Sequence, residues 1–347
     1  MKKKTSIIAF ILLVITFGFR VNHTPEFPTP KGWPLPQYDF RKNPLDSKKI
    51  ELGRMLFYDP ILSRDSSISC TSCHSQYSAF THVDHALSHG IDGKIGTRNS
   101  PALMNLAWGK SFMWDGAINH LDMQALAPIS NTLEMDDNIK NVVFKLQRSA
   151  IYSTLFYTAF GVKKIQGAHV LKSLSQFMLT LVSSNSKYDK MKQGAIKFTE
   201  AEHRGYLLFQ NHCSSCHKEP LFSNYQFENN GLHLDDSLLD IGRMRVTQHA
   251  VDSLKFKVPT LRNIEFTSPY MHDGRFQTLN QVLNHYIKGI MPSSTLSGIL
   301  KNGINLSPNE KADVVAFLLT LSDKEFVFNP QFSYPKSSFQ KNLKQAD

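Results

Sequence analysis

The sequence has few cysteines for its length, only four among 347 residues. That number excludes a disulfide-rich scaffold, and it is too small for two zinc sites of the four-cysteine kind. Long apolar runs are also scarce, because no segment after residue 19 is apolar enough to cross a bilayer. The sequence also lacks basic runs with interleaved aromatic residues, so a nucleic-acid-binding surface is not expected.

The overall composition is that of an ordinary globular protein. Hydrophobic residues make up 41% and charged residues 20% of the sequence, which excludes an intrinsically disordered chain. A length of 347 residues is enough for two domains with full hydrophobic cores. The formal net charge is +10, but four basic residues lie within the first 20 positions, so we expect a mixed, solvated surface for the rest.

The N-terminus has the pattern of a secretory leader. Three lysines at positions 2–4 precede an apolar run from Ile7 to Phe19. We therefore predict that residues 1–22 are a signal peptide and that the protein is exported to the periplasm. An uncleaved membrane anchor is the alternative, because no clean small-residue cleavage site follows the run. No cysteine follows it either, which excludes a lipid anchor at this site.

The four cysteines fall in two identical settings. They form the segments Cys70-Thr71-Ser72-Cys73-His74 and Cys213-Ser214-Ser215-Cys216-His217. C-x-x-C-H is the attachment signature of c-type haem. Two thiols at this spacing can reach the two vinyl groups along one edge of a haem, and the adjacent histidine can then ligate the iron.

Two other uses of these cysteines fit the pattern less well. A thioredoxin-like redox pair needs neither a histidine at this position nor a second copy. A zinc site built from Cys73, Cys216 and their partners leaves His74 and His217 without a role. We therefore predict two covalently bound haems, which use all four cysteines. Attachment outside the cytoplasm also agrees with the predicted leader.

Helix-capping signals surround both motifs. Thr199 and Glu202 form a capping box before the second motif, and Asp46 can cap a helix before the first. Ser307 and Glu310 form another capping box near the C-terminus, with a proline at the first helical position. Since no long alternating β pattern is present, we predict a mostly α fold.

An internal repeat appears once the two motifs are aligned. The segment 101–105, Pro-Ala-Leu-Met-Asn, recurs at 259–263 as Pro-Thr-Leu-Arg-Asn. Trp-Asp-Gly at 114–116 recurs as His-Asp-Gly at 272–274, with the same offset of 158 residues. The haem motifs themselves differ by 143 residues, so the loops between differ in length. We predict two related haem modules produced by duplication, with chance similarity of short motifs as the alternative.

Together these motifs resemble those of the bacterial dihaem cytochrome c peroxidases and their MauG-type relatives. The motifs are the two C-x-x-C-H sites, T-R-N-S-P at 97–101, F-x-W-D-G at 112–116 and P-Y-M-H-D-G at 269–274. The resemblance covers residues 45 to 325. It implies two cytochrome c-like domains, a peroxidatic one at 45–195 and an electron-transfer one at 196–328, followed by an extension at 329–347.

The resemblance assigns roles around the N-terminal haem, which reacts with peroxide in this family. His74 is its expected proximal ligand, and Gln124 and Glu134 stand where the family places two distal residues. Cleavage of H2O2 needs a group that takes a proton from one oxygen and returns it to the other, and a positioned carboxylate can do this. Trp114 is expected to pass electrons between the haems. A solvated glutamate, an ordinary helical glutamine and a core aromatic are the structural alternatives.

The C-terminal haem is the site of electron entry in typical peroxidases of this family. His217 is its expected proximal ligand. Those peroxidases use a methionine as sixth ligand on the helix after His-Asp-Gly, whereas this sequence has Tyr286 there, as MauG-type enzymes do. Tyrosine lowers a haem potential relative to methionine, because phenolate favours ferric iron. Met291 and His285 are the alternative ligands.

Some family members carry a removable histidine ligand on the distal side of the first haem. His89, directly before Gly90, is the nearest candidate in this sequence. His82 and His85 are weaker candidates, and a solvated loop position is the alternative for all three.

The family also binds one Ca²⁺ between its domains. The matching positions are the side chain of Asn99 and the backbone carbonyls of Thr267 and Pro269. Hard oxygen donors of this kind suit Ca²⁺. Capping or turn roles are the alternative for these residues.

The function that this resemblance implies is reduction of hydrogen peroxide to water. A small redox protein, a cytochrome c or a cupredoxin, is expected to supply the electrons. They are expected to pass from the C-terminal haem to the N-terminal haem. Two alternatives remain at this point. One is a MauG-like oxidase that uses peroxide to oxidise another protein, and the other is a non-enzymatic dihaem electron carrier. The family is often dimeric, so a homodimer is a further expectation.

Overall fold

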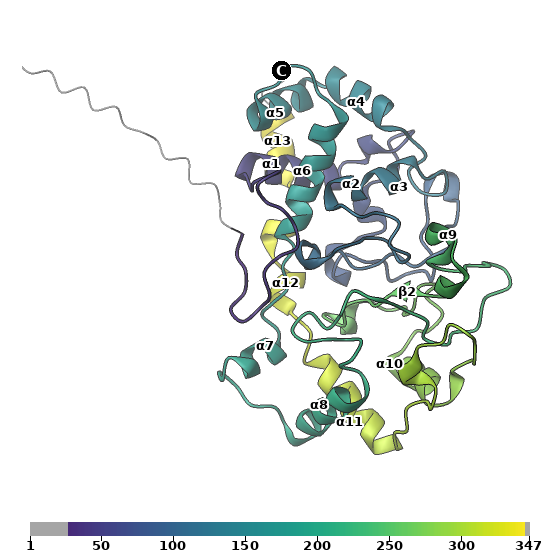
Figure 1. Ribbon diagram of the computed structural model, residues 1–347. Helices are drawn as coiled ribbons and strands as arrows, with labels where there is room; N and C mark the ends of the chain where they lie inside the picture. The colour runs from purple at the N-terminus through teal and green to yellow at the C-terminus, as the bar shows by residue number, and fades with distance from the viewer. Residues whose placement is uncertain (1–26, 344–347) are drawn as a thin grey trace, which may run out of the picture.

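The computed structural model describes residues 27–343, and helices dominate its regular structure (Figure 1). Two short strands, β1 (Phe227–Glu228) and β2 (Phe256–Lys257), form the one antiparallel sheet in this part of the chain. The mostly α class expected from the sequence is confirmed. Within residues 27–343, no helix is both long enough and apolar enough to cross a membrane. The predicted leader, residues 1–22, lies outside the described residues.

The helices from the first half of the chain lie together in the upper part of Figure 1. Helix α1 (Ser47–Tyr58) packs against α6 (Gly167–Thr180). Around this pair lie α2 (Leu121–Gln124), α3 (Leu126–Ser130), α4 (Ile139–Arg148) and α5 (Ala150–Phe160). Phe57, Phe80 and Phe177 lie at the centre of the buried core, with ring centroids 5.2 to 6.4 Å apart. Cys70 of the first C-x-x-C-H motif packs against this core.

A second pair of long helices lies in the lower part of Figure 1. Helix α8 (Glu200–His212) packs against α11 (Pro308–Leu319). The smaller helices of the second half are α9 (Met244–Thr247) and α10 (Leu279–Asn284). Helix α7 (Lys187–Lys192) precedes this half in the chain, and its Tyr188 packs in the core of this half. That separate core also contains Phe209, Phe222 and Phe317. The second C-x-x-C-H motif begins directly after α8.

The capping signals read from the sequence are present in the structure. The Thr199 and Ser307 side chains each accept a hydrogen bond from the third residue of their helix, and Glu202 and Glu310 bond back to them. The Asp46 side chain accepts from the backbone N–H groups of Lys48 and Lys49 in the first turn of α1. These side chains satisfy backbone N–H groups that a helix start otherwise leaves without partners.

Each of the two long helix pairs crosses at a glycine. A Cβ atom on Gly53 of α1 would overlap the carbonyl oxygen of Ser173 in α6. In the second half, a Cβ atom on Gly205 of α8 would overlap the carbonyl oxygen of Asp313 in α11. The two crossings therefore bring backbone against backbone, and only glycine allows that approach.

The segments that repeat in the sequence also adopt the same local structure. Residues 112–118 close by one antiparallel bridge, and residues 270–276 close by another between the matching positions. Asn105 and Asn263 both take a left-handed backbone conformation, with φ of 55° and 58°, at the start of a short 3-10 turn. Asparagine tolerates this conformation better than most residues.

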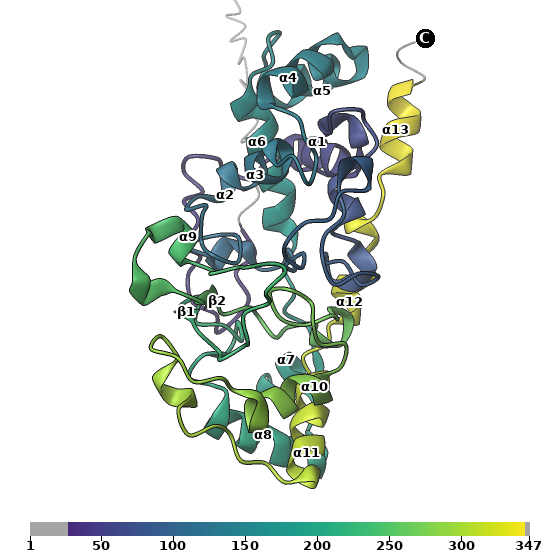
Figure 2. The same ribbon diagram turned by 90° about the vertical axis from the view of Figure 1, so that its right-hand side faces the viewer.

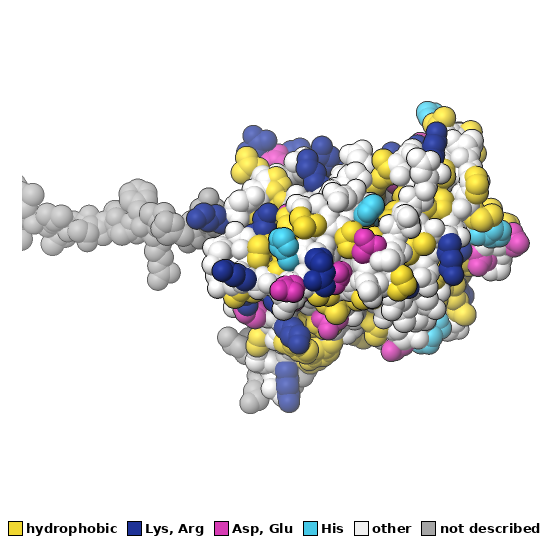
Figure 3. Space-filling model, turned by 90° about the horizontal axis from the view of Figure 1, so that it is seen from below, with side chains coloured by type: hydrophobic (Ala, Val, Ile, Leu, Met, Phe, Trp, Pro, Cys, Tyr) yellow, Lys and Arg dark blue, Asp and Glu magenta, His cyan; other side chains and the backbone are white. Residues whose placement is uncertain are grey.

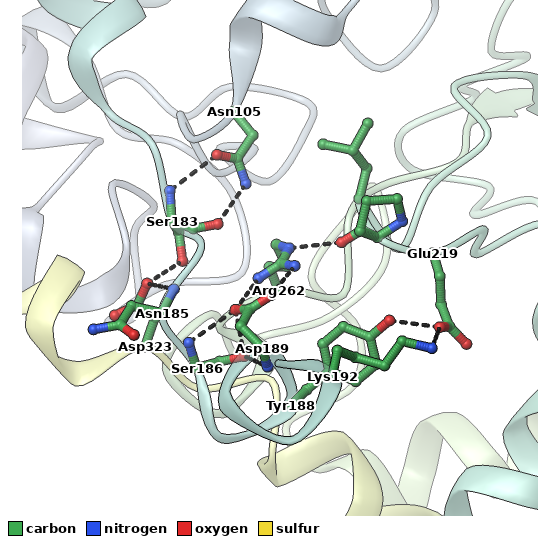
Figure 4. Close-up of polar contacts among 12 residues, drawn as sticks. Asn105, Ser183, Asn185, Ser186, Tyr188, Asp189, Lys192, Glu219, Arg262 and Asp323 are labelled. Atoms are coloured by element: carbon green, nitrogen blue, oxygen red, sulfur yellow. Dashed lines mark hydrogen bonds and ion pairs between the residues drawn. The ribbon is translucent and has the colours of Figure 1, made fainter. Parts of the chain in front are cut away.

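A buried polar network joins the two halves (Figure 4). Arg262 is fully buried and donates to both carboxylate oxygens of Asp189, at 2.8 and 2.7 Å. Ser183 is fully buried as well: its N–H donates to Asn105 at 2.9 Å, and its hydroxyl donates to Asp323 at 3.0 Å. The segment between the halves is thus hydrogen-bonded to both of them.

The end of the chain returns from the second half to the first. After α11, the chain passes through α12 (Lys324–Val327) and ends in α13 (Lys336–Leu343). Figures 1 and 2 both show α13 beside α1. Residues 329–343, part of the extension expected from the sequence, therefore pack on the first half of the molecule.

This returning segment contributes to the core of the first half. The Phe326 and Phe332 rings pack against Phe80, with centroids 5.8 and 6.4 Å from it. The Gln76 side chain donates to the Asn329 carbonyl oxygen at 2.8 Å. The turn that follows the first C-x-x-C-H motif is consequently held by the other end of the chain.

The charged side chains are dispersed on the face that Figure 3 shows. Lysine and arginine side chains there alternate with aspartate, glutamate and hydrophobic ones, and no large patch of one kind forms. This face agrees with the mixed, solvated surface expected from the composition.

Candidate functional site

The first C-x-x-C-H motif presents its histidine in a fixed orientation. The motif begins in a 3-10 turn, Cys70–Ser72, and the His74 Nδ1 atom lies 2.8 Å from the Phe80 carbonyl oxygen. Burial lowers the pKa of His74 to about 4, so the imidazole is neutral at physiological pH. Since Nδ1 then donates to the carbonyl, Nε2 carries the free lone pair that a metal ion requires.

The second motif is built in the same way. His217 Nδ1 lies 3.2 Å from the carbonyl oxygens of both Phe222 and Pro259. Burial lowers the pKa of His217 to about 4 as well. Both histidines are therefore neutral, oriented by backbone carbonyls and left with Nε2 available, which fits axial ligands of haem iron.

The thiols beside these histidines are not suited to roles that require a thiolate. Burial raises the pKa of Cys70 and of Cys213 to about 12, and all four cysteines are free of disulfides. A zinc ligand or a reactive redox cysteine has a thiolate stabilised by positive surroundings. Buried, neutral thiols in an apolar setting instead fit thioether bonds to a haem edge.

A cavity of about 270 Å³ adjoins the second motif. Cys213, Cys216 and His217 line it on one side, and Tyr286 lines it too. Most of its wall is apolar, with leucine and valine side chains from α8, α10 and α11. A largely apolar cavity beside two thiols and an imidazole fits a flat, hydrophobic macrocycle.

Tyr286 is the one candidate for a sixth ligand here that lines the cavity. It lies in a π-helical turn, His285–Gly289, and burial raises its pKa to about 12 although a hydrogen bond with Asn230 lowers it. His285 instead points its Nε2 at the Asn230 carbonyl oxygen, 3.0 Å away. Met291 is exposed to solvent. Neither of these alternatives belongs to the cavity wall.

In the first half, Gln124 ends α2 with an unsatisfied polar atom. Its Nε2 donates to the Met113 sulfur at 3.1 Å, while its buried Oε1 has no hydrogen-bond partner within the described residues. A buried amide oxygen without a partner is costly, so it indicates a place where a bound molecule completes the hydrogen bonding.

Glu134 is a partly buried carboxyl group near the first motif. Burial raises its pKa, and a 2.7 Å hydrogen bond from the Asn131 side chain opposes that rise. The Glu134 charge also raises the pKa of Cys73, after the larger effect of burial. The carboxyl group thus lies within electrostatic range of the cysteine that precedes His74.

The three histidines of the loop 82–89 form a cluster. His82 Nε2 lies 3.0 Å from His85 Nδ1, and the rings of His85 and His89 are 4.1 Å apart. The His89 carbonyl oxygen faces the Cys73 sulfur at 3.4 Å, and Gly90 packs closely on the backbone of Glu134. The loop therefore borders the first site through its backbone, with the His89 ring directed to His85.

Trp114 belongs to the first half but lines the cavity of the second. Its Nε1 donates to the Asn99 carbonyl oxygen at 2.8 Å, and its own carbonyl oxygen accepts from the Lys257 N–H at 2.7 Å. These bonds hold Trp114 at the boundary between the two halves.

The three residues expected to bind Ca²⁺ come together at the same boundary. Asn99, Thr267 and Pro269 all line the cavity. Asn99 donates through its side-chain nitrogen to the Ala86 carbonyl oxygen at 2.9 Å and through its backbone to the His272 carbonyl oxygen at 2.7 Å. In the described chain, no group of three or more His, Cys, Asp or Glu side chains has the arrangement of a metal site.

The sequence reasoning missed an ion-pair bridge between the halves. Arg98 donates to Asp115 at 2.6 Å and to both oxygens of Asp240 at 2.6 and 2.9 Å. Arg98 and Asp115 lie in the motifs at 97–101 and 112–116, so the sequence did mark these two positions. Asp240 lies in a loop without a counterpart in the first half, and nothing in the sequence singled it out.

Comparison with protein families matches residues 47–197 to the di-haem cytochrome c peroxidase model. The methylamine utilization protein MauG of Methylorubrum extorquens is 36% identical over 308 residues, covering 85% of this chain and 83% of that protein. The cytochrome c551 peroxidase of Nitrosomonas europaea is 33% identical, covering 84% of each chain. A crystallised MauG-like protein associated with microbial copper homeostasis is 32% identical, with a TM-score of 0.81, covering 90% of this chain and 99% of that one.

Proposed function

The chain belongs to the di-haem cytochrome c peroxidase family, as a peroxidase oxidoreductase with two c-type haems, and we propose that its two sites divide the reaction. Hydrogen peroxide reacts at the site of His74, and electrons arrive at the site of His217. The observation that carries this division is the unpaired, buried Oε1 of Gln124 in the first half. The second site has Tyr286 facing its cavity instead.

Each haem is proposed to be held by one C-x-x-C-H motif, Cys70, Cys73 and His74 or Cys213, Cys216 and His217. When bound, it supplies an iron that can bind peroxide oxygen and exchange electrons. The carbonyls of Phe80 and Phe222 keep each imidazole in one orientation and tautomer. A hydrogen bond at Nδ1 also raises the basicity of the ligating Nε2.

Glu134 and Gln124 are proposed to handle peroxide and its protons. The carboxylate of Glu134 takes the proton from one peroxide oxygen and returns it to the departing oxygen, as a general base and then a general acid. Its raised pKa brings that exchange closer to neutral pH. The free Oε1 of Gln124 accepts a hydrogen bond from the bound peroxide, and its Nε2 bond to Met113 keeps the amide from rotating.

Trp114 is proposed to carry electrons from the second site to the first. It reaches the cavity of the second site from a segment of the first half, and its indole N–H and its backbone carbonyl are both hydrogen-bonded. A fixed aromatic ring at the boundary shortens the distance over which each electron has to pass.

Tyr286 favours a second candidate function, a MauG-like oxidation of another protein. A phenolate ligand lowers the potential of the second haem, which makes that haem a poorer acceptor of electrons from a small redox donor. The rate of steady-state peroxide consumption, measured with reduced cytochrome c or cupredoxin as electron donor, distinguishes the two functions. Sustained turnover supports the peroxidase, and negligible turnover with several donors supports the protein oxidase.

The two halves are further proposed to be duplicated haem modules, at 45–195 and 196–328, with the segment 329–347 as an addition to them. The glycine at each helix crossing, the matching bridges and the two left-handed asparagines support this proposal. These features recur in three separate parts of each half, which favours duplication over the alternative, chance similarity of short motifs.

The remaining expectations concern the surroundings of the enzyme. We propose that residues 1–22 direct export to the periplasm, that one Ca²⁺ binds at Asn99, Thr267 and Pro269, and that the chain forms a homodimer. The electron donor is proposed to be a small cytochrome c or cupredoxin.

The substitution Glu134→Gln tests the proposed chemistry. It should lower the rate of the reaction with peroxide by about 10²- to 10⁴-fold, which is the usual contribution of a general acid–base group. Both haems should stay bound, as measured by the absorbance of the pyridine haemochrome. Glu200→Gln, at an exposed glutamate at the start of α8, is the matched control. Full activity in Glu134→Gln would refute the assigned role.

A further inference from the structure

Lys257 lines the cavity beside the second C-x-x-C-H motif, at the boundary between the halves. It lies in β2, and its backbone N–H donates to the Trp114 carbonyl oxygen at 2.7 Å. Its Nζ donates to the carbonyl oxygen of Ser111 at 3.0 Å. The lysine thus contacts the first half through both its backbone and its side chain.

No carboxylate neutralises this ammonium group. Within residues 27–343, no aspartate or glutamate lies at ion-pair distance from Lys257 Nζ. Asp115 attracts it from further away, but that carboxylate is already paired with Arg98 at 2.6 Å. Burial lowers the pKa of Lys257 to about 8, which reflects the missing partner.

The cavity itself makes Lys257 the natural partner of an anion. It is the one lysine or arginine among the residues that line this cavity. The haem proposed for the site carries two propionate groups, which are carboxylates on the otherwise apolar macrocycle. A carboxylate that enters an apolar cavity needs a cation or several hydrogen-bond donors in reach.

We propose that Lys257 binds a propionate of the haem attached at Cys213 and Cys216, and thereby raises the reduction potential of that haem. The proposal rests on the two-haem assignment of the previous section, but not on which haem reacts with peroxide. A propionate without its cation leaves a negative charge beside the iron, and that charge stabilises the ferric form. The backbone N–H of Lys257 also donates to the carbonyl oxygen of Trp114, so the same residue contacts both the haem propionate and the proposed electron carrier.

The test is a spectroelectrochemical titration of the second haem in Lys257→Met, without peroxide. At the potential where the wild-type haem is half reduced, the ferrous-to-ferric ratio should fall about tenfold, a shift of about 59 mV for one electron. Lys257→Arg, which keeps the charge, should stay close to wild type. Lys255→Met is the matched control, because that neighbouring lysine faces Asp252 at 3.6 Å and does not line the cavity.

An unchanged potential in Lys257→Met, with both haems bound, would overturn the proposal. If that variant fails to retain its second haem, Lys257→Gln and Lys257→Arg decide the question in its place. The glutamine variant should have the lower potential of the two, and equal potentials would overturn the proposal. Because no peroxide is used, the outcome is independent of the catalytic assignment of Glu134 and Gln124.

Discussion

At the scale of single residues, the proton chemistry of the first site depends on a balance of two effects on Glu134. Burial raises the pKa of this carboxyl group, and the hydrogen bond from Asn131 lowers it. The two effects act on the same proton that the carboxylate is proposed to move. Asn131 therefore sets the pH range in which Glu134 is ionised, although it need not touch the substrate.

Asn131→Ala should move the acidic limb of the peroxide reaction to higher pH. Glu134 acts first as a base, so the rate falls when pH drops below its pKa, and loss of the 2.7 Å hydrogen bond raises that pKa further. The measurement is the pH profile of the second-order rate constant by stopped flow. Asn302→Ala, at an exposed position, is the control. An acidic limb at the wild-type pH would contradict this account.

Tyr286→Phe should remove the sixth ligand of the second haem. The low-spin signal of that haem should then change to a high-spin one, because phenylalanine has no oxygen to offer the iron. Electron paramagnetic resonance of the ferric protein measures the change. Met291→Leu alters the exposed alternative and should leave the spectrum as it is. A spectral change in the methionine variant alone would exclude tyrosine ligation.

The residues predicted from the sequence are those whose chemistry is local. The C-x-x-C-H motifs contain both thiols and the imidazole within five positions, so spacing alone predicts their use. Lys257 and Asp240 could not be found in this way. Their roles come from neighbours more than 100 positions away in the chain, Ser111 for one and Arg98 for the other.

At the scale of secondary-structure elements, the two crossings of long helices depend on close backbone contact. Gly205 meets the Asp313 carbonyl oxygen and lies near the Cβ atom of Phe317 in α11. The capping boxes of these helices were predictable, since each lies within four consecutive residues. The crossing glycines were not, because their contacts depend on how two distant helices meet.

Gly205→Ala should destabilise the second half. The added methyl group overlaps backbone in α11, so the helices must move apart, at a cost of about 1–3 kcal/mol or more. Chemical denaturation of the holoprotein, followed by circular dichroism, measures the loss. Gly298→Ala is the matched control, because a Cβ atom there meets nothing within 4 Å. Equal midpoints for the two variants would show that the crossing adjusts freely.

At the scale of the whole molecule, the two halves are joined at their boundary and also by the C-terminal segment, which returns to the first half. The returning C-terminal segment places Phe326 and Phe332 against Phe80, whose carbonyl oxygen holds His74. The family resemblance ends before Asn329, so the sequence suggested only an extension from there onward. It could not show the destination of that segment, because a few apolar residues near a chain end have no periodicity that identifies their partner.

Phe326→Ala should destabilise the first half although the residue follows the last helix of the second. Phe326 is 3% exposed, and loss of such a side chain from a core costs about 3–5 kcal/mol. Thermal unfolding followed at the Soret band of the first haem measures the effect. Phe328→Ala, at a side chain that is 59% exposed, should change stability by less than about 0.5 kcal/mol. An unchanged unfolding temperature in Phe326→Ala would show that the returning segment does not contribute to the stability of the first half.

The returning segment also orders the events of biogenesis. Because a chain is made from its N-terminus, the first half exists without Phe326 and Phe332 until nearly the whole protein has been synthesised. During that interval the wall behind His74 is open, and the turn at Gln76 lacks its bond to Asn329. A first half that lacks the returning segment is therefore expected to hold the turn after His74 less firmly than the complete protein does.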